Sequence, residues 1–173
     1  MTLPIANRQI PWIILGVSIL TIAGALFFEY VIGLAPCALC LDQRVPYYLA
    51  MPVALAAGLF SREANLGLTP LILIGLLALI YAVGTGYGGY HAGVEYKWWL
   101  GPQGCTGVGA MPGSIEEFQA QLQNLKVPMC DEIPWSLFGI SLAGFNFFIS
   151  LGLCALASLV LVRHWRATGV EDV

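Results

Sequence analysis

Two cysteines separated by two residues, Cys37 and Cys40, carry the strongest chemical signal in the sequence. A disulfide between them would close a very short ring, so it would restrain little chain and make a poor structural staple. The spacing is typical of thiol–disulfide exchange, in which two sulfurs alternate as attacking and leaving groups. The other interpretations are an inert external clip and half of a metal site, although zinc normally takes a second closely spaced ligand pair.

An arginine four residues after the pair adds a permanent positive charge beside it. We expect Cys40 at the N-terminus of a helix, where the helix dipole favours a thiolate and lowers the cysteine pKa. Arg44 then lies on the same face of that helix. A cation at the edge of an apolar segment is costly unless it serves something, which favours redox exchange over an inert clip.

A second pair, Cys105 and Cys130, brackets a segment with its own pattern. The run from Ser114 to Glu117 fits a capping box, and apolar residues then recur every three or four positions. We therefore expect a short amphipathic helix that lies in the membrane interface. The pair itself is either a mobile disulfide presented to another protein or a plain loop staple. The fifth cysteine, Cys154, is expected to be a small apolar filler inside a helix.

The composition determines what kind of scaffold must hold these cysteines. The chain of 173 residues is 58% hydrophobic and only 10% charged, with a mean hydropathy of +0.80. Soluble domains average about 25% charged residues, and disordered chains combine low hydrophobicity with high net charge. A net charge of −3 gives no basic field for nucleic acid. We predict a single membrane domain over residues 1–173.

Four long stretches without a charged residue define the expected helices, because a helix that crosses a bilayer needs about 20 apolar residues. We predict an all-α, polytopic membrane protein with a bundle of four transmembrane helices. The predicted helices lie near 10–30, 43–60, 69–88 and 138–162, and the outer loops near 31–42 and 89–137.

The basic residues indicate how this bundle is oriented. Four arginines lie with the termini and the middle loop, and three cations lie on the other side: Arg8, Arg62, Arg163 and Arg166 against Arg44, Lys97 and Lys126. The positive-inside rule therefore favours cytoplasmic termini. Both cysteine pairs then face the outer compartment, where thiols can be oxidised.

Three further features near the outer boundary have two interpretations each. His91 is either a hydrogen-bonded interfacial residue or part of a site. Four glycines between positions 84 and 89 allow close helix packing or leave room for a flat ligand. Asn146 is expected to link helices rather than to form a site.

Taken together, these residues resemble the disulfide bond formation protein B (DsbB) family, the quinone-dependent thiol oxidases of bacterial inner membranes. The resemblance covers nearly the whole chain, because helix number, loop lengths and both cysteine pairs agree in order. The matching residues are Pro36 to Cys40, Gln43-Arg44, Tyr90-His91 through Glu95, and the pair Cys105 and Cys130. Two departures are modest: Gln43 stands where an acidic residue also occurs in relatives, and Cys154 has no family role.

The resemblance implies a route for electrons. The Cys105–Cys130 disulfide would oxidise a periplasmic, DsbA-like partner of thioredoxin fold, and Cys130 would then exchange with the Cys37–Cys40 disulfide. Cys40 would contact a quinone, ubiquinone or menaquinone, in a charge-transfer or covalent adduct that Cys37 resolves. Arg44 would hold this cofactor, with His91 close to it. The quinone pool would pass the electrons to the respiratory chain.

Two other classes of protein share part of this pattern. A relative of vitamin K epoxide reductase would also couple a membrane-edge Cys-x-x-Cys to a quinone, but its pair lies later in the bundle. A four-helix scaffold with stapled external loops, like a tetraspanin or a claudin, would need no chemistry at all. The position of Cys40 beside Arg44 argues against the scaffold.

Overall fold

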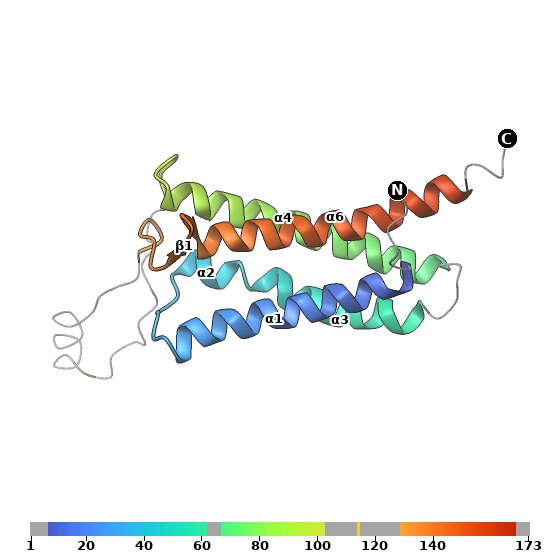
Figure 1. Cartoon of the computed structure of the whole chain (residues 1–173), viewed down its shortest axis with the longest axis horizontal. Helices are drawn as coiled ribbons and strands as arrows, with labels where there is room; N and C mark the ends of the chain where they lie inside the picture. Colours follow the sequence, from blue (N-terminus) through green and yellow to red (C-terminus); the bar gives the residue numbers. More distant parts are fainter. Residues whose placement is uncertain (1–6, 62–66, 103–113, 115–128, 169–173) are drawn as a thin grey trace.

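The computed structural model describes residues 7–61, 67–102, 114 and 129–168. Within these ranges the chain is helical apart from loops and one small hairpin (Figure 1). In chain order the elements are η1 Asn7–Gln9, α1 Ile10–Tyr30, α2 Ala38–Asp42, α3 Val45–Phe60, α4 Leu68–Glu95, β1 Ser136–Leu137, β2 Ile140–Ser141 and α6 Leu142–Thr168.

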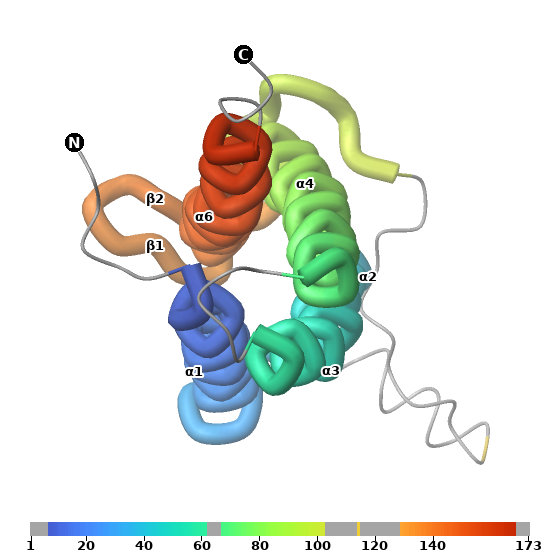
Figure 2. Tube along the Cα trace, turned by 90° about the vertical axis from the view of Figure 1, so that its right-hand side faces the viewer, coloured from blue at the N-terminus to red at the C-terminus, as the bar shows by residue number. Residues whose placement is uncertain are grey.

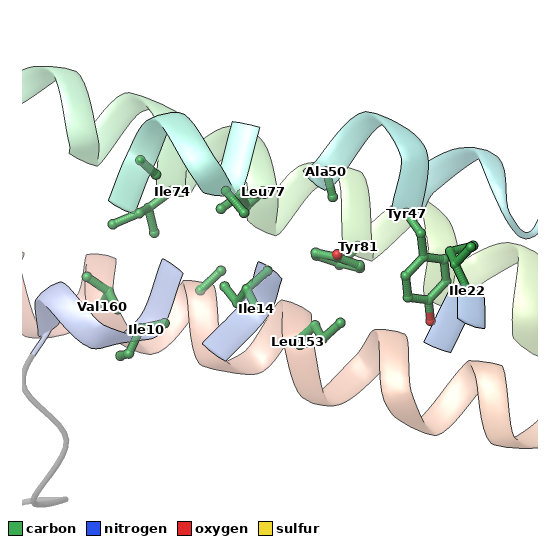
Figure 3. Close-up of a cluster of buried hydrophobic side chains, with 13 residues drawn as sticks. Ile10, Ile14, Ile22, Tyr47, Ala50, Ile74, Leu77, Tyr81, Leu153 and Val160 are labelled. Carbon is green, nitrogen blue, oxygen red and sulfur yellow. The ribbon is translucent and has the colours of Figure 1, made fainter. Parts of the chain in front are cut away.

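The helices α1, α3, α4 and α6 run side by side as a bundle (Figures 1 and 2). Their shared core consists of apolar side chains that are almost fully buried, among them Ile14, Ala50 and Leu77 (Figure 3). Large apolar side chains also cover the outside, where Leu20 is 72% and Leu79 is 62% exposed. Helices that are apolar on every face are typical of proteins surrounded by lipid.

Three helical segments are long and apolar enough to cross a membrane, namely Asn7–Tyr30, Leu68–Glu95 and Leu142–Thr168. The sequence predicts four crossings, and the remaining bundle helix, α3, has 16 residues. At about 1.5 Å per residue α3 is roughly 24 Å long, short of a hydrocarbon core of about 30 Å. A fourth crossing by α3 therefore stays a prediction.

A short joint replaces the expected start of the second helix at residue 43. The chain forms α2, then a turn at Gln43 and Arg44, and α3 begins only at Val45. Pro46 sits in the first turn of α3, where a missing backbone N–H costs little. Gln43 and Arg44 both keep helical backbone angles, so the side chains on either side of the joint still point to a common region.

The third long helix continues past its expected end at 88, and α4 stops only at Glu95. Lys97 adopts a left-handed backbone with φ of 61°, and the N–H groups of Lys97 and Trp98 return to the carbonyls of Val94 and Gly93. This is the Schellman arrangement, which satisfies the last carbonyls of a helix. Because Lys97 takes the position that glycine usually occupies, the sequence gives no glycine signal for this end.

Three of the four glycines between positions 84 and 89 serve close packing, whereas a Cβ atom at Gly86 would meet no atom within 4 Å. A Cβ atom at Gly88 would lie 2.9 Å from the backbone of Phe147 on α6, so only glycine permits this approach. The two helices share the most extensive contact in the bundle. This packing holds the outer end of α4, which carries His91, firmly against α6.

A two-stranded hairpin before α6 departs from the expected all-α fold. Strands β1 and β2 pair antiparallel, and Phe138 and Gly139 form the two-residue turn with positive φ values of 52° and 79°. Such turns match the twist of a hairpin and favour glycine at one position. The predicted amphipathic helix after Ser114 and the cysteine Cys105 lie outside the described residues.

Candidate functional site

The Cys-x-x-Cys pair lies at the start of α2. Cys37 is the N-cap residue, and its Sγ accepts a hydrogen bond from the backbone N–H of Cys40 at 3.3 Å. The two Sγ atoms are 3.1 Å apart, and both cysteines are free thiols. Cys37 is buried, whereas Cys40 is partly exposed. The two sulfurs need to approach by only about 1 Å to form a disulfide, whose S–S bond is about 2.05 Å long.

The structure assigns the thiolate to Cys37. A hydrogen bond with the Cys40 thiol lowers the pKa of Cys37 to about 4, against the opposing effect of burial, and a hydrogen bond with His91 acts in the same direction. The pKa of Cys40 is raised, first because its proton is shared with the Cys37 sulfur and second by burial. The expectation that Cys40 carries the lowered pKa is therefore wrong, because Cys37 is the residue at the helix N-cap.

This assignment predicts the pH dependence of the reduced pair. The thiolate of Cys37 should be present from about pH 9 down to about pH 4 and be lost only as the pH falls through about 4. An ordinary thiol would lose its charge near pH 9 instead. We expect the thiolate ultraviolet absorbance to show this in a variant with Cys105, Cys130 and Cys154 replaced by serine. If Cys37→Ser leaves that acidic titration unchanged, the assignment is wrong.

His91 reaches this pair from the far end of α4. Its side chain is 1% exposed, and Nε2 lies 3.6 Å from Cys37 Sγ while Nδ1 contacts the Gln43 amide nitrogen. The Gln43 amide is bonded in turn to Asn146 on α6 at 2.5 Å. The Asn146 side chain accepts a hydrogen bond from the Tyr47 hydroxyl at 2.6 Å. The prediction that Asn146 links helices is confirmed, and it links them at the site.

Sulfur and imidazole are also zinc ligands, so the cluster bears on the metal interpretation of the pair. The side chains of Cys37, Cys40 and His91 each place one such atom within 4.8 Å of the others. Structural zinc sites take four ligands, and the described residues bring together three. The cluster fits thiol exchange better, because its two sulfurs lie close enough to bond to each other.

Arg44 has a partner that the sequence analysis did not identify. Its Nη1 is 2.6 Å from Oε2 of Glu29 near the end of α1, and their side chains are 12% and 20% exposed. A nearly buried cation is stable only when it is paired in this way. One signal was available, because Glu29 and Arg44 are the charges that bound two predicted spans at the same membrane surface.

A cavity of about 570 Å³ opens beside the pair, between α1, the start of α3 and α6. Its wall is mostly apolar and includes the aromatic rings of Phe28 and Trp135. Among the described residues that line it, Cys40 supplies the sulfur and Arg44 supplies the positive charge. His91 does not line this cavity and contacts the other cysteine, Cys37, so its proximity to a cofactor stays a prediction.

Cys130 lies next to the same pair. It is disulfide-bonded, 2% exposed, and buried in one cluster with Cys37, Leu39 and Val94, against which Cys40 also packs. An ion pair between Lys97 and Asp131, at 2.5 Å, joins the end of α4 to the residue after Cys130. The chain therefore holds one cysteine of the second pair against the first pair, across more than 90 residues of sequence.

The last cysteine stands apart from the site. Cys154 lies in α6, packs against the main core, and its Sγ donates to the Ala78 carbonyl at 3.4 Å. The packing against the core is that of the apolar filler that the sequence predicts. Cys154 therefore provides an internal control for experiments on the other cysteines.

Comparison with known proteins agrees with this geometry. The family model described as "Disulfide bond formation protein DsbB" matches residues 7–160. A protein named "Disulfide bond formation protein B" from Albidiferax ferrireducens is 32% identical over 158 residues, which cover 86% of this chain and 82% of that protein. A second, from Acidovorax sp. (strain JS42), is 29% identical over 93% of this chain and 91% of its own length. No solved structure matches the chain significantly.

Proposed function

Because this chain belongs to the disulfide bond formation protein DsbB family, we propose that it re-oxidises a DsbA-like periplasmic dithiol and passes the electrons to a membrane quinone. The family makes the chain a disulfide-generating oxidoreductase of the membrane. One observation carries the finer assignment: Cys40 lies on the wall of the apolar cavity, while Cys37 lies in the buried cluster with Cys130. The first pair thus has Cys40 at the cavity proposed for the quinone and Cys37 beside the second cysteine pair.

The first stage transfers the disulfide of the second pair to the partner. A partner thiolate attacks the Cys105–Cys130 disulfide at Cys105 and forms a mixed disulfide, and Cys130 leaves as a thiolate. The second partner thiol then releases Cys105, so the partner gains a disulfide and this chain gains two thiols. The burial of Cys130 beside the first pair supports its role as the residue that exchanges onward.

The second stage exchanges the reduced second pair with the Cys37–Cys40 disulfide, which leaves Cys37 and Cys40 reduced. The Cys37 thiolate is then the nucleophile that closes the bond to Cys40, 3.1 Å away. This re-oxidation of the first pair balances: one thiolate, one thiol, one proton and one quinone give one disulfide and one quinol. The low pKa of Cys37 supports this direction, because attack requires the thiolate form.

The residues around the cavity fit a quinone. The volume of about 570 Å³ lies within the range of small-molecule sites, about 300–1,000 Å³, and the mostly apolar wall suits a flat ring. When bound, a quinone accepts two electrons and two protons. Arg44 uses Nη1 for Glu29 and keeps other N–H donors, which can hold a carbonyl oxygen and stabilise negative charge on it.

The membrane arrangement completes the proposal. The chain crosses the bacterial inner membrane four times with α3 as the fourth crossing, and both termini are cytoplasmic. The two cysteine pairs then face the periplasm, where the partner is found. Cys40 lines the cavity between α1 and α6, so a lipid-soluble electron acceptor can reach it from the bilayer.

Acid trapping of thiols in cells tests this function against the scaffold alternative. With a partner whose second cysteine is replaced by serine, the partner should remain attached to Cys105 as a mixed disulfide, because the thiol that releases Cys105 is absent. This complex should still form with the Cys154→Ser variant and should be absent with Cys105→Ser. A stapled scaffold would give fully oxidised protein and no mixed disulfide in any variant, and that result would exclude the proposed role.

A further inference from the structure

Among the described residues, His91 is the buried imidazole of the site, and its two ring nitrogens have different neighbours. Nε2 faces the sulfur of Cys37 at 3.6 Å, and Nδ1 faces the side-chain amide of Gln43. A neutral imidazole has one N–H donor and one acceptor nitrogen, whereas the protonated form has two donors. The hydrogen bond at one nitrogen therefore decides what the other can do.

The orientation of the Gln43 amide is fixed from outside the imidazole. Its nitrogen Nε2 donates to the backbone carbonyl of Leu39 at 3.2 Å. The amide oxygen could not replace this nitrogen, because two oxygens that only accept cannot hydrogen-bond to each other. Its oxygen Oε1 accepts from Asn146 at 2.5 Å. The Asn146 amide is held in turn by the Tyr47 hydroxyl, which donates to its oxygen at 2.6 Å. Reversal of the Gln43 amide would break two of these bonds.

We propose that Gln43 is a positioning residue that holds His91 in the neutral tautomer with the proton on Nε2, so that this N–H points at the Cys37 sulfur. The second N–H of the Gln43 amide meets Nδ1, which must then be an acceptor. His91 accordingly donates a hydrogen bond to the Cys37 thiolate and does not take the proton of Cys37. The inference deepens the proposed function, since that thiolate is the nucleophile that closes the disulfide.

None of the other described groups around His91 is hydrogen-bonded to Nδ1, so the Gln43 amide determines which ring nitrogen carries the proton. The α2 segment brings Cys37 and Cys40, and α4 itself brings Glu95, which accepts a hydrogen bond from the Ser141 hydroxyl. Asn146 from α6 and Gln43 from the joint are uncharged. Within the described ranges, the Gln43 amide is the side chain hydrogen-bonded to Nδ1.

The tautomer can be read directly from the side-chain ¹⁵N resonances of histidine in the labelled, reduced protein. A His164→Gln variant removes the second histidine of the chain, so that the remaining signals belong to His91. We expect a protonated Nε2 and an unprotonated Nδ1 at neutral pH. The measurement needs neither quinone nor partner, so its outcome is independent of the proposed electron transfer.

Two substitutions of Gln43 then test its causal role. Gln43→Glu offers Nδ1 an acceptor in place of a donor, so Nδ1 should become protonated. Gln43→Met removes the amide, and the ionisation constant of the Cys37 thiol should fall roughly fivefold, the equivalent of one ordinary hydrogen bond. Ser18→Ala, which removes a buried hydroxyl bonded to Tyr81 elsewhere in the bundle, is the matched control and should change neither readout.

The inference is overturned by either of two results. One is a protonated Nδ1 in the protein with Gln43 intact. The other is a Gln43→Glu variant that folds and keeps the ¹⁵N pattern of the parent. If Gln43→Met does not fold, Gln43→Glu still decides the question, because it retains an oxygen that accepts from Asn146.

Discussion

Replacing Cys40 with serine is expected to abolish electron transfer from thiols to quinone, with a loss on the order of a thousandfold or more, as for other residues that form the reacting bond. Cys40 is the cysteine on the cavity wall, and it is also the sulfur that Cys37 must attack. A serine keeps the size of the side chain but forms no disulfide. The Cys37–Cys40 disulfide then cannot form, so the first stage can take place once and the second stage not at all.

The measurement is anaerobic quinone reduction by the purified protein with excess reduced partner. Cys154→Ser is the matched control, since it removes one sulfur from α6 outside the site and should retain full activity. A Cys40→Ser protein that still reduces quinone at the parental rate would contradict the proposed electron path. Equal loss in Cys154→Ser would indicate general damage to the bundle instead.

Replacing Arg44 with methionine is expected to raise the apparent KM for quinone by about ten- to a hundredfold, the range for a hydrogen bond from a charged donor. Arg44 is the cation of the cavity wall, and methionine conserves its apolar stem without the donors. The Cys37–Cys40 exchange with the second pair should be unaffected, because neither cysteine is changed.

The ion pair with Glu29 complicates a single substitution, and a double variant separates the two effects. Arg44→Met alone leaves the Glu29 carboxylate in a poorly exposed position without its partner, which destabilises the fold. Arg44→Met with Glu29→Gln removes both charges, so stability should recover while quinone affinity stays low. Glu29→Gln alone should retain quinone affinity. An unchanged quinone KM in the double variant would remove Arg44 from the site.

The chemistry-bearing residues could be predicted from sequence where their types and local spacing are themselves the signal. Cys37 and Cys40 are three positions apart and Arg44 is four further on, so one helix start and the turn after it are enough to bring them together. The membrane helices were predictable for the same local reason, because long apolar stretches must satisfy their backbone groups within themselves.

The rest depended on contacts between distant parts of the chain. Gln43 meets His91 48 positions away and Asn146 103 positions away, and no local pattern encodes either contact. The assignment of the thiolate failed for a finer reason. It depends on which cysteine caps α2, and a helix boundary predicted from sequence is not accurate to the three residues that separate Cys37 from Cys40.

The hairpin and the end of α4 show a different limit. Phe138 and Lys97 adopt left-handed backbone angles that favour glycine in most proteins. Local hydrogen bonds from the N–H groups of Lys97 and Trp98 hold Lys97 in this conformation, and the Tyr96 hydroxyl donates to the Gly139 carbonyl at 2.6 Å in the hairpin turn. Lysine is not a residue type that signals a helix end, so the extension of α4 to Glu95 could not be foreseen.

The ratio of quinol formed to partner disulfide formed tests most directly whether electrons pass from the partner through this chain to quinone. Purified protein, reduced DsbA-like partner and ubiquinone are mixed without oxygen, and quinol absorbance and partner disulfide are followed together. The account predicts one quinol for each partner disulfide, with no quinol when either the partner or Cys40 is missing. Partner disulfide formed without quinol, or quinol formed without the partner, would contradict it.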